Sequence, residues 1–194
     1  MPAHLLVEVE TTDAALMAEY RKHTPGLVAK FGGRFTVRGG TTEPVEGDWR
    51  PQRIVFIEFP DMTALKGFYS CEEYQPVLNM RLAAGRSRAI AVEGEPCAPS
   101  RAFLMVDVSI TDAAKMVQYR EQVPTVVGPQ GGRFIVRTDK VETVEGGWRP
   151  ERLTVVGFPD MAALRACYFS DAYRPLRDLR LSATRSLGIL VEGV

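Results

Sequence analysis

The sequence has no surplus of either charge and few residues of the kinds that build disulfides or metal sites. Lys+Arg and Asp+Glu number 24 each among 194 residues, so the formal net charge is zero. A nucleic-acid-binding protein needs a cationic surplus to displace counterions from phosphates, so no nucleic-acid partner is expected. Three cysteines without a CxxC pair predict free thiols in a reducing cytoplasm. His4 and His23 show no ligand spacing, so no metal is expected.

Long apolar runs and nucleotide-binding motifs are missing as well. The apolar start of the chain is interrupted by Glu8 and Glu10, so neither a signal peptide nor a membrane span is predicted. No GxGxxG, P-loop, GxSxG or HExxH pattern occurs. The sequence therefore predicts no cofactor, no membrane partner and no serine-hydrolase chemistry.

What the sequence does contain is the same unit written twice. At an offset of 99 residues, 45 of 95 aligned positions are identical without a gap. GGRF at 32–35 recurs at 131–134, and FPDM at 59–62 recurs at 158–161. A period near 100 residues suits a complete small domain. We expect one repeat at 1–94, a Pro-containing linker at 95–100 and a second repeat at 101–194.

Hydrophobic periodicity predicts the same order of elements in each repeat. In the first repeat, strands are expected at 4–10, 34–38, 53–59 and 87–93, with a short extension at 41–46. Thr12 and Asp13 should cap a helix that runs to about Lys30, and a second helical region should start at Pro60 and break near Ser70. The order β-α-β-β-α-β is the ferredoxin-like arrangement, an α+β fold.

A ferredoxin-like unit leaves one face of its sheet bare. Because an exposed apolar sheet face is an association surface, two copies in one chain can cover each other. We therefore predict an intramolecular pseudo-dimeric α/β barrel and leave open a further homodimer.

The motifs GGRFxVR, EGxWRPxR, the FP turn and YxxxxYxP (69–76) together resemble the bacterial family called domain of unknown function 1330, of the dimeric α/β-barrel superfamily. The resemblance covers nearly all of both repeats. It implies a sheet paired into a barrel whose lumen binds small molecules. The resemblance also implies relatives in that superfamily that act as cofactor-free monooxygenases, isomerases, polyketide cyclases and haem-using enzymes. Copy two departs from the family's IEFP strand end, because Glu58 is replaced there by Gly157.

Strand alternation assigns side chains to the lumen or to the helices. In copy one it places toward the lumen His4, Leu6, Glu8, Arg34, Thr36, Arg38, Ile54, Phe56, Glu58, Ala89 and Ala91. In copy two it places there Phe103, Met105, Asp107, Ile135, Arg137, Val155, Gly157 and Leu190. Copy two is more apolar, so we hypothesise one polar site centred on copy one. Neutral drift in two ordinary cores is the alternative.

Glu58 and Arg38 form the sharpest predicted pair. Glu58 is a candidate general base, and Arg38 a candidate ligand for an anionic or carbonyl oxygen. A structural ion pair is the alternative. Arg137 repeats Arg38 although copy two lacks the glutamate, which favours a further role for this arginine. His4 is a candidate acid/base, or a strand-start histidine without a role.

Aromatic residues complete the candidate site. Tyr20, Tyr69 and Tyr74 recur in copy two and are either core residues or donors to a substrate oxygen. Trp49 either closes the cavity or packs on the other copy. Arg53 and Arg152 are expected to pair with Glu46 and Glu145. The predicted substrate-binding set is Tyr20, Tyr69, Tyr74, Trp49, Glu8, Thr36, Phe56 and Arg137, with Glu58, His4 and Arg38 catalytic.

Three functions remain open from the sequence. The first is a cofactor-independent enzyme that acts on a small carbonyl or aromatic metabolite by proton transfer (isomerase, cyclase or lyase type) or by direct oxygenation, in a biosynthetic role. The second is a non-catalytic small-molecule-binding protein, and the third a structural protein with a packed lumen. Glu58→Gln separates the first two, because a catalyst should lose turnover and keep binding.

Overall fold

The two halves of the chain contain the same elements in the same order. The computed structural model describes every residue from 1 to 194. The first half comprises β1 (Ala3–Thr11), α1 (Ala14–Lys30), β2 (Arg34–Arg38), β3 (Thr42–Glu46), β4 (Ile54–Phe59), α2 (Met62–Ser70), α3 (Tyr74–Ala83) and β5 (Gly85–Glu93). The second half comprises β6 (Ala102–Ile110), α4 (Ala113–Val127), a short 3-10 helix (Gly128–Gln130), β7 (Arg133–Thr138), β8 (Glu142–Glu145), β9 (Leu153–Phe158), α5 (Met161–Tyr168), α6 (Arg174–Ser182) and β10 (Thr184–Glu192).

Repeated local signals set the ends of the helices. The side chain of Asp13 accepts a hydrogen bond from the backbone N–H of Leu16 at 2.9 Å and caps α1, as expected. Asp112 caps α4 in the same way. Gly32 follows α1 with φ at 70°, a left-handed conformation that favours glycine. This explains the first glycine of the GGRF motif.

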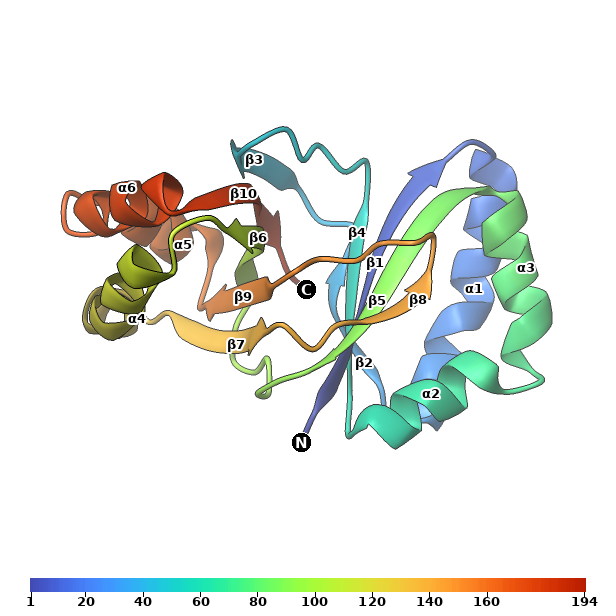
Figure 1. Cartoon of the computed structure of the whole chain (residues 1–194). Helices are drawn as coiled ribbons and strands as arrows, with labels where there is room; N and C mark the ends of the chain where they lie inside the picture. The colour runs from blue at the N-terminus through green and yellow to red at the C-terminus, as the bar shows by residue number, and fades with distance from the viewer.

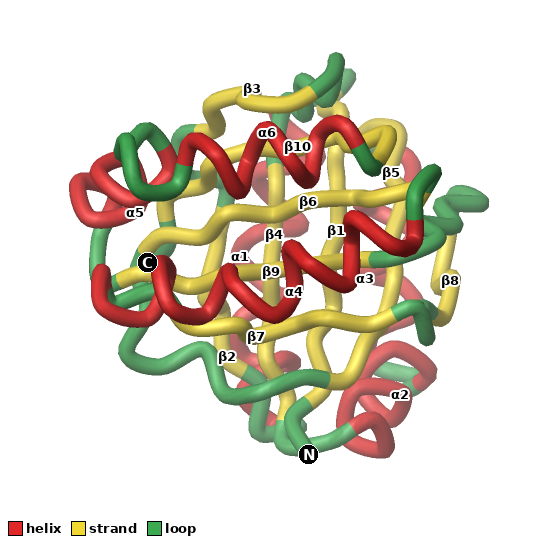
Figure 2. Tube along the Cα trace, turned by 60° about the vertical axis from the view of Figure 1, so that its left-hand side comes forward, coloured by secondary structure: helices red, strands yellow, loops and turns green.

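The elements form four layers, with helices outside and two sheets inside (Figure 1). Helices α1–α3 cover one sheet, and α4–α6 cover the other. The bare faces of the sheets meet, and their strands cross steeply (Figure 2). The predicted α+β pseudo-dimer of two tandem ferredoxin-like repeats is therefore confirmed. None of the helices combines the length and the apolarity needed to cross a membrane.

Each half donates one strand to the sheet of the other half. The sheet orders are β2-β4-β1-β5-β8 and β3-β10-β6-β9-β7. Strand β8 of the second repeat thus pairs with β5, and β3 of the first repeat pairs with β10. The residue pattern at 41–46 predicts only an extension and not this exchange. The exchange ties the repeats together through backbone hydrogen bonds as well as through apolar packing.

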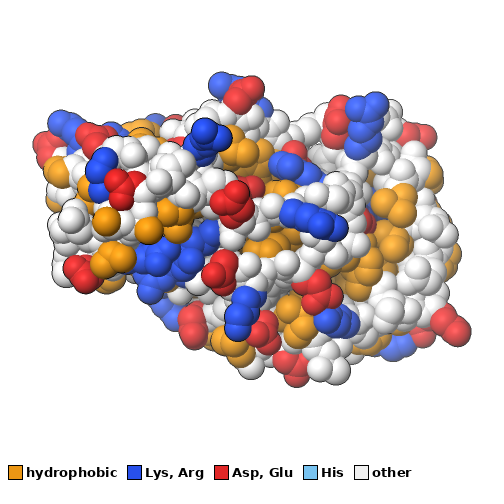
Figure 3. Space-filling model, viewed as in Figure 1, with side chains coloured by type: hydrophobic (Ala, Val, Ile, Leu, Met, Phe, Trp, Pro, Cys, Tyr) orange, Lys and Arg blue, Asp and Glu red, His pale blue; other side chains and the backbone are white.

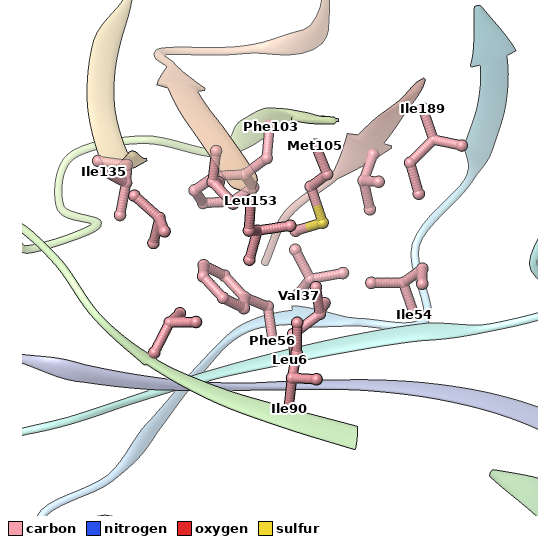
Figure 4. Packing of buried hydrophobic residues seen from close by; sticks show 14 of the residues in the cluster. Leu6, Val37, Ile54, Phe56, Ile90, Phe103, Met105, Ile135, Leu153 and Ile189 are labelled. Atoms are coloured by element: carbon pink, nitrogen blue, oxygen red, sulfur yellow. The ribbon is translucent and has the colours of Figure 1, made fainter. Parts of the chain in front are cut away.

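The space between the sheets is filled with apolar side chains. Seventeen buried residues from both halves form one cluster there. Phe56 of one sheet meets Phe103 of the other edge to face, with ring centroids 6.0 Å apart, and Leu6 and Met105 pack beside them (Figure 4). The lumen therefore serves as a core, and the prediction that it is the binding cavity is wrong.

Two strand assignments are wrong for reasons the alternation rule does not capture. A β-bulge between Phe35 and Val37 shifts the register of β2, so Val37 enters the lumen and Arg38 turns to the helix side. In β5, Ala89 and Ala91 face the helices, and the larger Ile90 enters the lumen. The same errors in copy two affect Arg137 and Leu190, which lie on the helix side of their sheet.

Candidate functional site

Two small cavities lie between the sheets and their own helices, and a larger, open groove of about 850 Å³ lies beside β5 and β7. The first cavity, of about 30 Å³, lies under α1–α3, and the second, of about 40 Å³, lies under α4–α6. The first is lined by 15 residues, and the residue 99 positions later lines the second cavity in every case. Only four of these pairs differ in residue type: Thr24/Val123, Val55/Thr154, Ile57/Val156 and Phe68/Cys167.

This correspondence overturns the hypothesis of one polar site centred on copy one. Both cavities keep the same arginines and tyrosines at corresponding positions, and only the single threonine lies on a different element. The divergence noted in the sequence, such as His4 against Phe103, falls on the lumen side of the sheets instead. The protein therefore has two matching candidate sites.

A pair of tyrosines forms the inner end of each cavity. The hydroxyls of Tyr20 and Tyr74 lie 3.5 Å apart in the first half, and those of Tyr119 and Tyr173 lie 3.2 Å apart in the second. Burial, and then the neighbouring Tyr20, raise the pKa of Tyr74 well above its usual value. The Tyr74 hydroxyl therefore stays protonated at neutral pH and can act as a hydrogen-bond donor.

An arginine next to each tyrosine pair is held by a glutamate of the opposite repeat. Arg81 lies over the ring of Tyr20 and donates to both carboxylate oxygens of Glu145, at 2.6 and 2.9 Å. In the second half, Arg180 donates to Glu46 at 2.7 and 2.5 Å. Both glutamates stand at the ends of the exchanged strands β3 and β8. Each of these arginines is therefore held in place by the other half of the chain.

The charge on the buried glutamate is maintained by its partners. Burial alone would raise the pKa of Glu46, but the hydrogen bonds and charge of Arg180 outweigh it and hold the pKa below the usual value. The hydroxyl of Tyr168 donates a further hydrogen bond to Glu46 at 2.8 Å. The expected pairs of Arg53 with Glu46 and of Arg152 with Glu145 are therefore wrong.

Three arginines from three different elements surround the mouth of each cavity. Arg21 of α1, Arg38 of β2 and Arg53 before β4 line the first cavity. Arg120, Arg137 and Arg152 occupy the same places in the second. A patch of basic side chains is visible beside α4 and strands β7 and β9 (Figure 3). Each site thus joins an apolar floor to a cationic entrance.

The structure brings together only part of the predicted site. Tyr20, Tyr74 and Arg38 line the first cavity, and Arg137 lines the second. The other predicted binding residues make contacts elsewhere: Tyr69 donates to Glu145, Trp49 stacks edge to face on Trp148 and donates to Glu8, Thr36 donates to the backbone of Phe56, and Phe56 lies in the lumen.

Glu58 and His4 form a buried cluster with Cys97 of the linker. Glu58 accepts from Arg34 at 2.8 Å and from the backbone N–H of Cys97 at 2.5 Å, so the predicted pair with Arg38 is wrong. His4 Nε2 lies 3.0 Å from the carbonyl oxygen of Glu95, and His4 Nδ1 lies 3.8 Å from Cys97 Sγ. This cluster fastens the linker to β1 and β4.

The cluster is also the one group in the protein with the donor types of a metal site. One ligand atom each from His4, Glu58 and Cys97 lies within 4.8 Å of the others. Burial lowers the pKa of His4 to about 4 and raises that of the Cys97 thiol to about 12. Because Glu58 is already paired with Arg34, a cation would compete with a guanidinium for it. We interpret the cluster as a structural latch.

Comparison with known proteins places the chain in a family. The sequence profile described as "Domain of unknown function (DUF1330)" matches residues 2–95 and again residues 101–194. The chain belongs to the DUF1330 family. The resemblance stated from the motifs is thereby confirmed. No curated protein sequence matches the chain.

Solved structures share the DUF1330 tandem fold at low sequence identity. A "putative monooxygenase" from Lactobacillus acidophilus NCFM has a TM-score of 0.57 at 9% identity, covering 100% of this chain and 98% of that one. A "putative chlorite dismutase" has a TM-score of 0.56 at 14% identity, covering 100% and 94%. A heme-binding protein from Thermus thermophilus has a TM-score of 0.53 at 8% identity, covering 100% and 91%. These likenesses establish the fold alone.

Sequence reasoning missed several residues of the DUF1330 cavities. Arg21 and Arg81 were not singled out, although both recur at the offset of 99, as Arg120 and Arg180. The signal that could have identified them is that the same position holds an arginine in both repeats. Nothing local in the sequence shows that these arginines converge, because their elements are brought together only by packing.

Proposed function

We propose that each half of this DUF1330 protein binds a small molecule in the cavity between its sheet and its helices. There it stabilises the negatively charged form of a carbonyl or phenolic group without a cofactor. The observation that carries this proposal is the donor set of the cavities. Arginines and tyrosines supply every strong polar group in both linings, and neither lining contains a carboxylate or an imidazole.

Such a donor set suits a reaction that passes through an enolate or a phenolate. Preorganised N–H and O–H donors in a dry site stabilise negative charge as it develops on oxygen. A protonated tyrosine such as Tyr74 can donate a hydrogen bond to that oxygen, and water returns the proton to the product. Arg38 keeps its predicted role as a ligand for the oxygen. Proton transfer of the isomerase, cyclase or lyase type, or direct oxygenation of the anion, fits this chemistry.

Glu58 and His4 have no part in this version of the mechanism. They lie in the latch and line neither cavity. The proton must therefore leave an acidic position of the substrate for water. Neither lining supplies a histidine for a haem iron, and at about 30 and 40 Å³ both cavities must widen to admit any ligand that carries a ring.

A non-catalytic binding protein is the second candidate. The absence of a base from the linings favours it. The two candidates differ in one respect: a catalyst accelerates proton exchange in its ligand, whereas a binding protein leaves the exchange rate unchanged.

Proton exchange in a neutral aromatic ketone separates the candidates. The probe is 2-tetralone in D₂O, whose acidic α-protons are followed by ¹H NMR with and without protein. We expect acceleration over buffer, and a loss of about 10²-fold or more when Tyr74→Phe is combined with its twin Tyr173→Phe. Glu58→Gln is the matched control and should leave the rate unchanged.

The results assign the function as follows. Binding of 2-tetralone without acceleration supports the binding protein. Loss of acceleration in Glu58→Gln, with Tyr74→Phe/Tyr173→Phe unaffected, would return catalysis to the latch and contradict the proposal.

A further inference from the structure

The three arginines at each cavity mouth form a cluster of like charge in which none makes a salt bridge. The first triad is Arg21, Arg38 and Arg53, and the second is Arg120, Arg137 and Arg152. None of the six takes part in any ion pair of the protein. The chain has 24 carboxylate side chains for its 24 cationic ones, so a shortage of acidic residues does not explain this.

Backbone contacts hold the first triad in place. Arg53 donates to the carbonyl oxygen of Arg38 at 2.7 Å, and Arg38 donates to the carbonyl oxygen of Arg21 at 3.2 Å. The guanidinium of Arg38 also lies 5.0 Å from the ring centroid of Phe35. Since each guanidinium carries five N–H donors, most remain free for a ligand. The Nε atom of Arg21 is buried and has no hydrogen-bond partner at all.

This arrangement is costly unless a ligand offsets it. A buried donor without a partner destabilises the folded state, and so does a set of like charges in a partly buried site. Burial, then Arg21 and Arg38, lower the pKa of Arg53. In the second half, burial and then Arg120 lower the pKa of Arg152, Asp139 opposes them, and Arg137 lowers it by a smaller amount. Two copies of the same unfavourable cluster point to a retained use.

We infer that the ligand of each cavity is an amphipathic carboxylate, with its apolar body on the cavity floor and its carboxylate between the three guanidinium groups. This inference rests on the proposed function and adds the substrate class. The planar fork of arginine matches a carboxylate, and a charge-assisted hydrogen bond is about twice as strong as a neutral one. At about 30 and 40 Å³ the cavities are smaller than such a body, so the floor must open as the ligand enters.

The test uses two ligands that share one body. trans-Cinnamate carries a carboxylate, and trans-cinnamamide carries a neutral amide of nearly the same shape. Both are titrated into the ¹⁵N-labelled full chain, and the backbone amides and the arginine Nε–H signals are followed by NMR. We expect cinnamate to bind at least about tenfold more tightly, to shift arginine Nε–H signals, and to weaken with added salt.

Variants locate the anion site. Arg53→Gln combined with its twin Arg152→Gln should reduce the preference for cinnamate to less than about threefold. Arg38→Gln/Arg137→Gln, at two exposed positions, provides a second pair whose folding is not at risk. Arg86→Gln/Arg185→Gln makes the same change of net charge away from the cavities and should keep the full preference.

The possible failures are distinguishable. If both ligands bind equally well at the cavity amides, the carboxylate inference is overturned and the cavity proposal stands. If neither ligand shifts the cavity amides at millimolar concentration, the proposed function fails and the inference fails with it. A preference for cinnamate that survives both triad variants would overturn the assignment to these arginines.

Discussion

The buried ion pair between Glu46 and Arg180 should dominate the stability of the strand exchange, and Glu46→Gln tests this. The two side chains are 1% and 4% exposed, and two hydrogen bonds join them across the repeats. The substitution leaves the Arg180 charge buried with a weaker partner. Removing one member of a buried pair costs about 3–5 kcal/mol, which corresponds to a fall in the unfolding temperature of roughly 6–20 °C for a chain of this size.

The assay is thermal and urea unfolding followed by circular dichroism, with three comparison variants. Glu43→Gln lies on the same strand but removes an ion pair whose side chains are 49% and 37% exposed, so a loss below about 0.5 kcal/mol is expected. Glu145→Gln breaks the matching pair of Arg81 and should cost somewhat less than Glu46→Gln, because Glu145 is 13% exposed. Glu46→Leu combined with Arg180→Met should recover most of the loss. If Glu46→Gln costs no more than Glu43→Gln, the exchange is not held by this pair.

Further predictions concern the latch and the lumen. Burial lowers the pKa of His4 from 6.5 in the unfolded chain to about 4 in the folded protein. As the pH falls below 6.5, the unfolded chain therefore binds more protons than the folded one. The free energy of unfolding should fall by about 2 kcal/mol between pH 7 and pH 5. His4→Phe, which installs the residue of copy two, should remove this part of the pH dependence in urea titrations, and an unchanged slope would show that His4 does not titrate in this way. Phe56→Ala should cost about 3–5 kcal/mol in the same assay because Phe56 is fully buried in the lumen cluster; a loss below about 1 kcal/mol would mean that the lumen is loosely packed.

The fold could be predicted because its signals are local and duplicated. The aspartate caps, the double glycine and the apolar alternation all occur twice at one offset, and a bare sheet face required a partner. The strand exchange could not be predicted, since the choice of partner for 42–46 depends on contacts distant in sequence. The sequence pattern showed only that 41–46 is an extension.

Only part of the predicted site lines the candidate cavities, which lie on the helix side of each sheet and not in the lumen. Alternation sorts a strand into two faces but does not say which face meets the helices. In β5 both faces are aliphatic, so size decided the outcome: the alanines lie under the helices and Ile90 enters the lumen. The bulge after Phe35 turns the Arg38 side chain from the lumen face of β2 to its helix face, because a shift of one residue exchanges the two faces of a strand. Arg38 and Arg137 were chosen for a lumen that they do not reach, and they line the helix-side cavities instead.

The central claim is that small molecules bind between sheet and helices in both halves. A crystal structure of the full chain soaked with trans-cinnamate measures this directly. We predict ligand density over Val7 and Val106, with the carboxylate beside Arg53 in the first half and beside Arg152 in the second. Density between the two sheets, next to Phe56 and Phe103, would contradict the account.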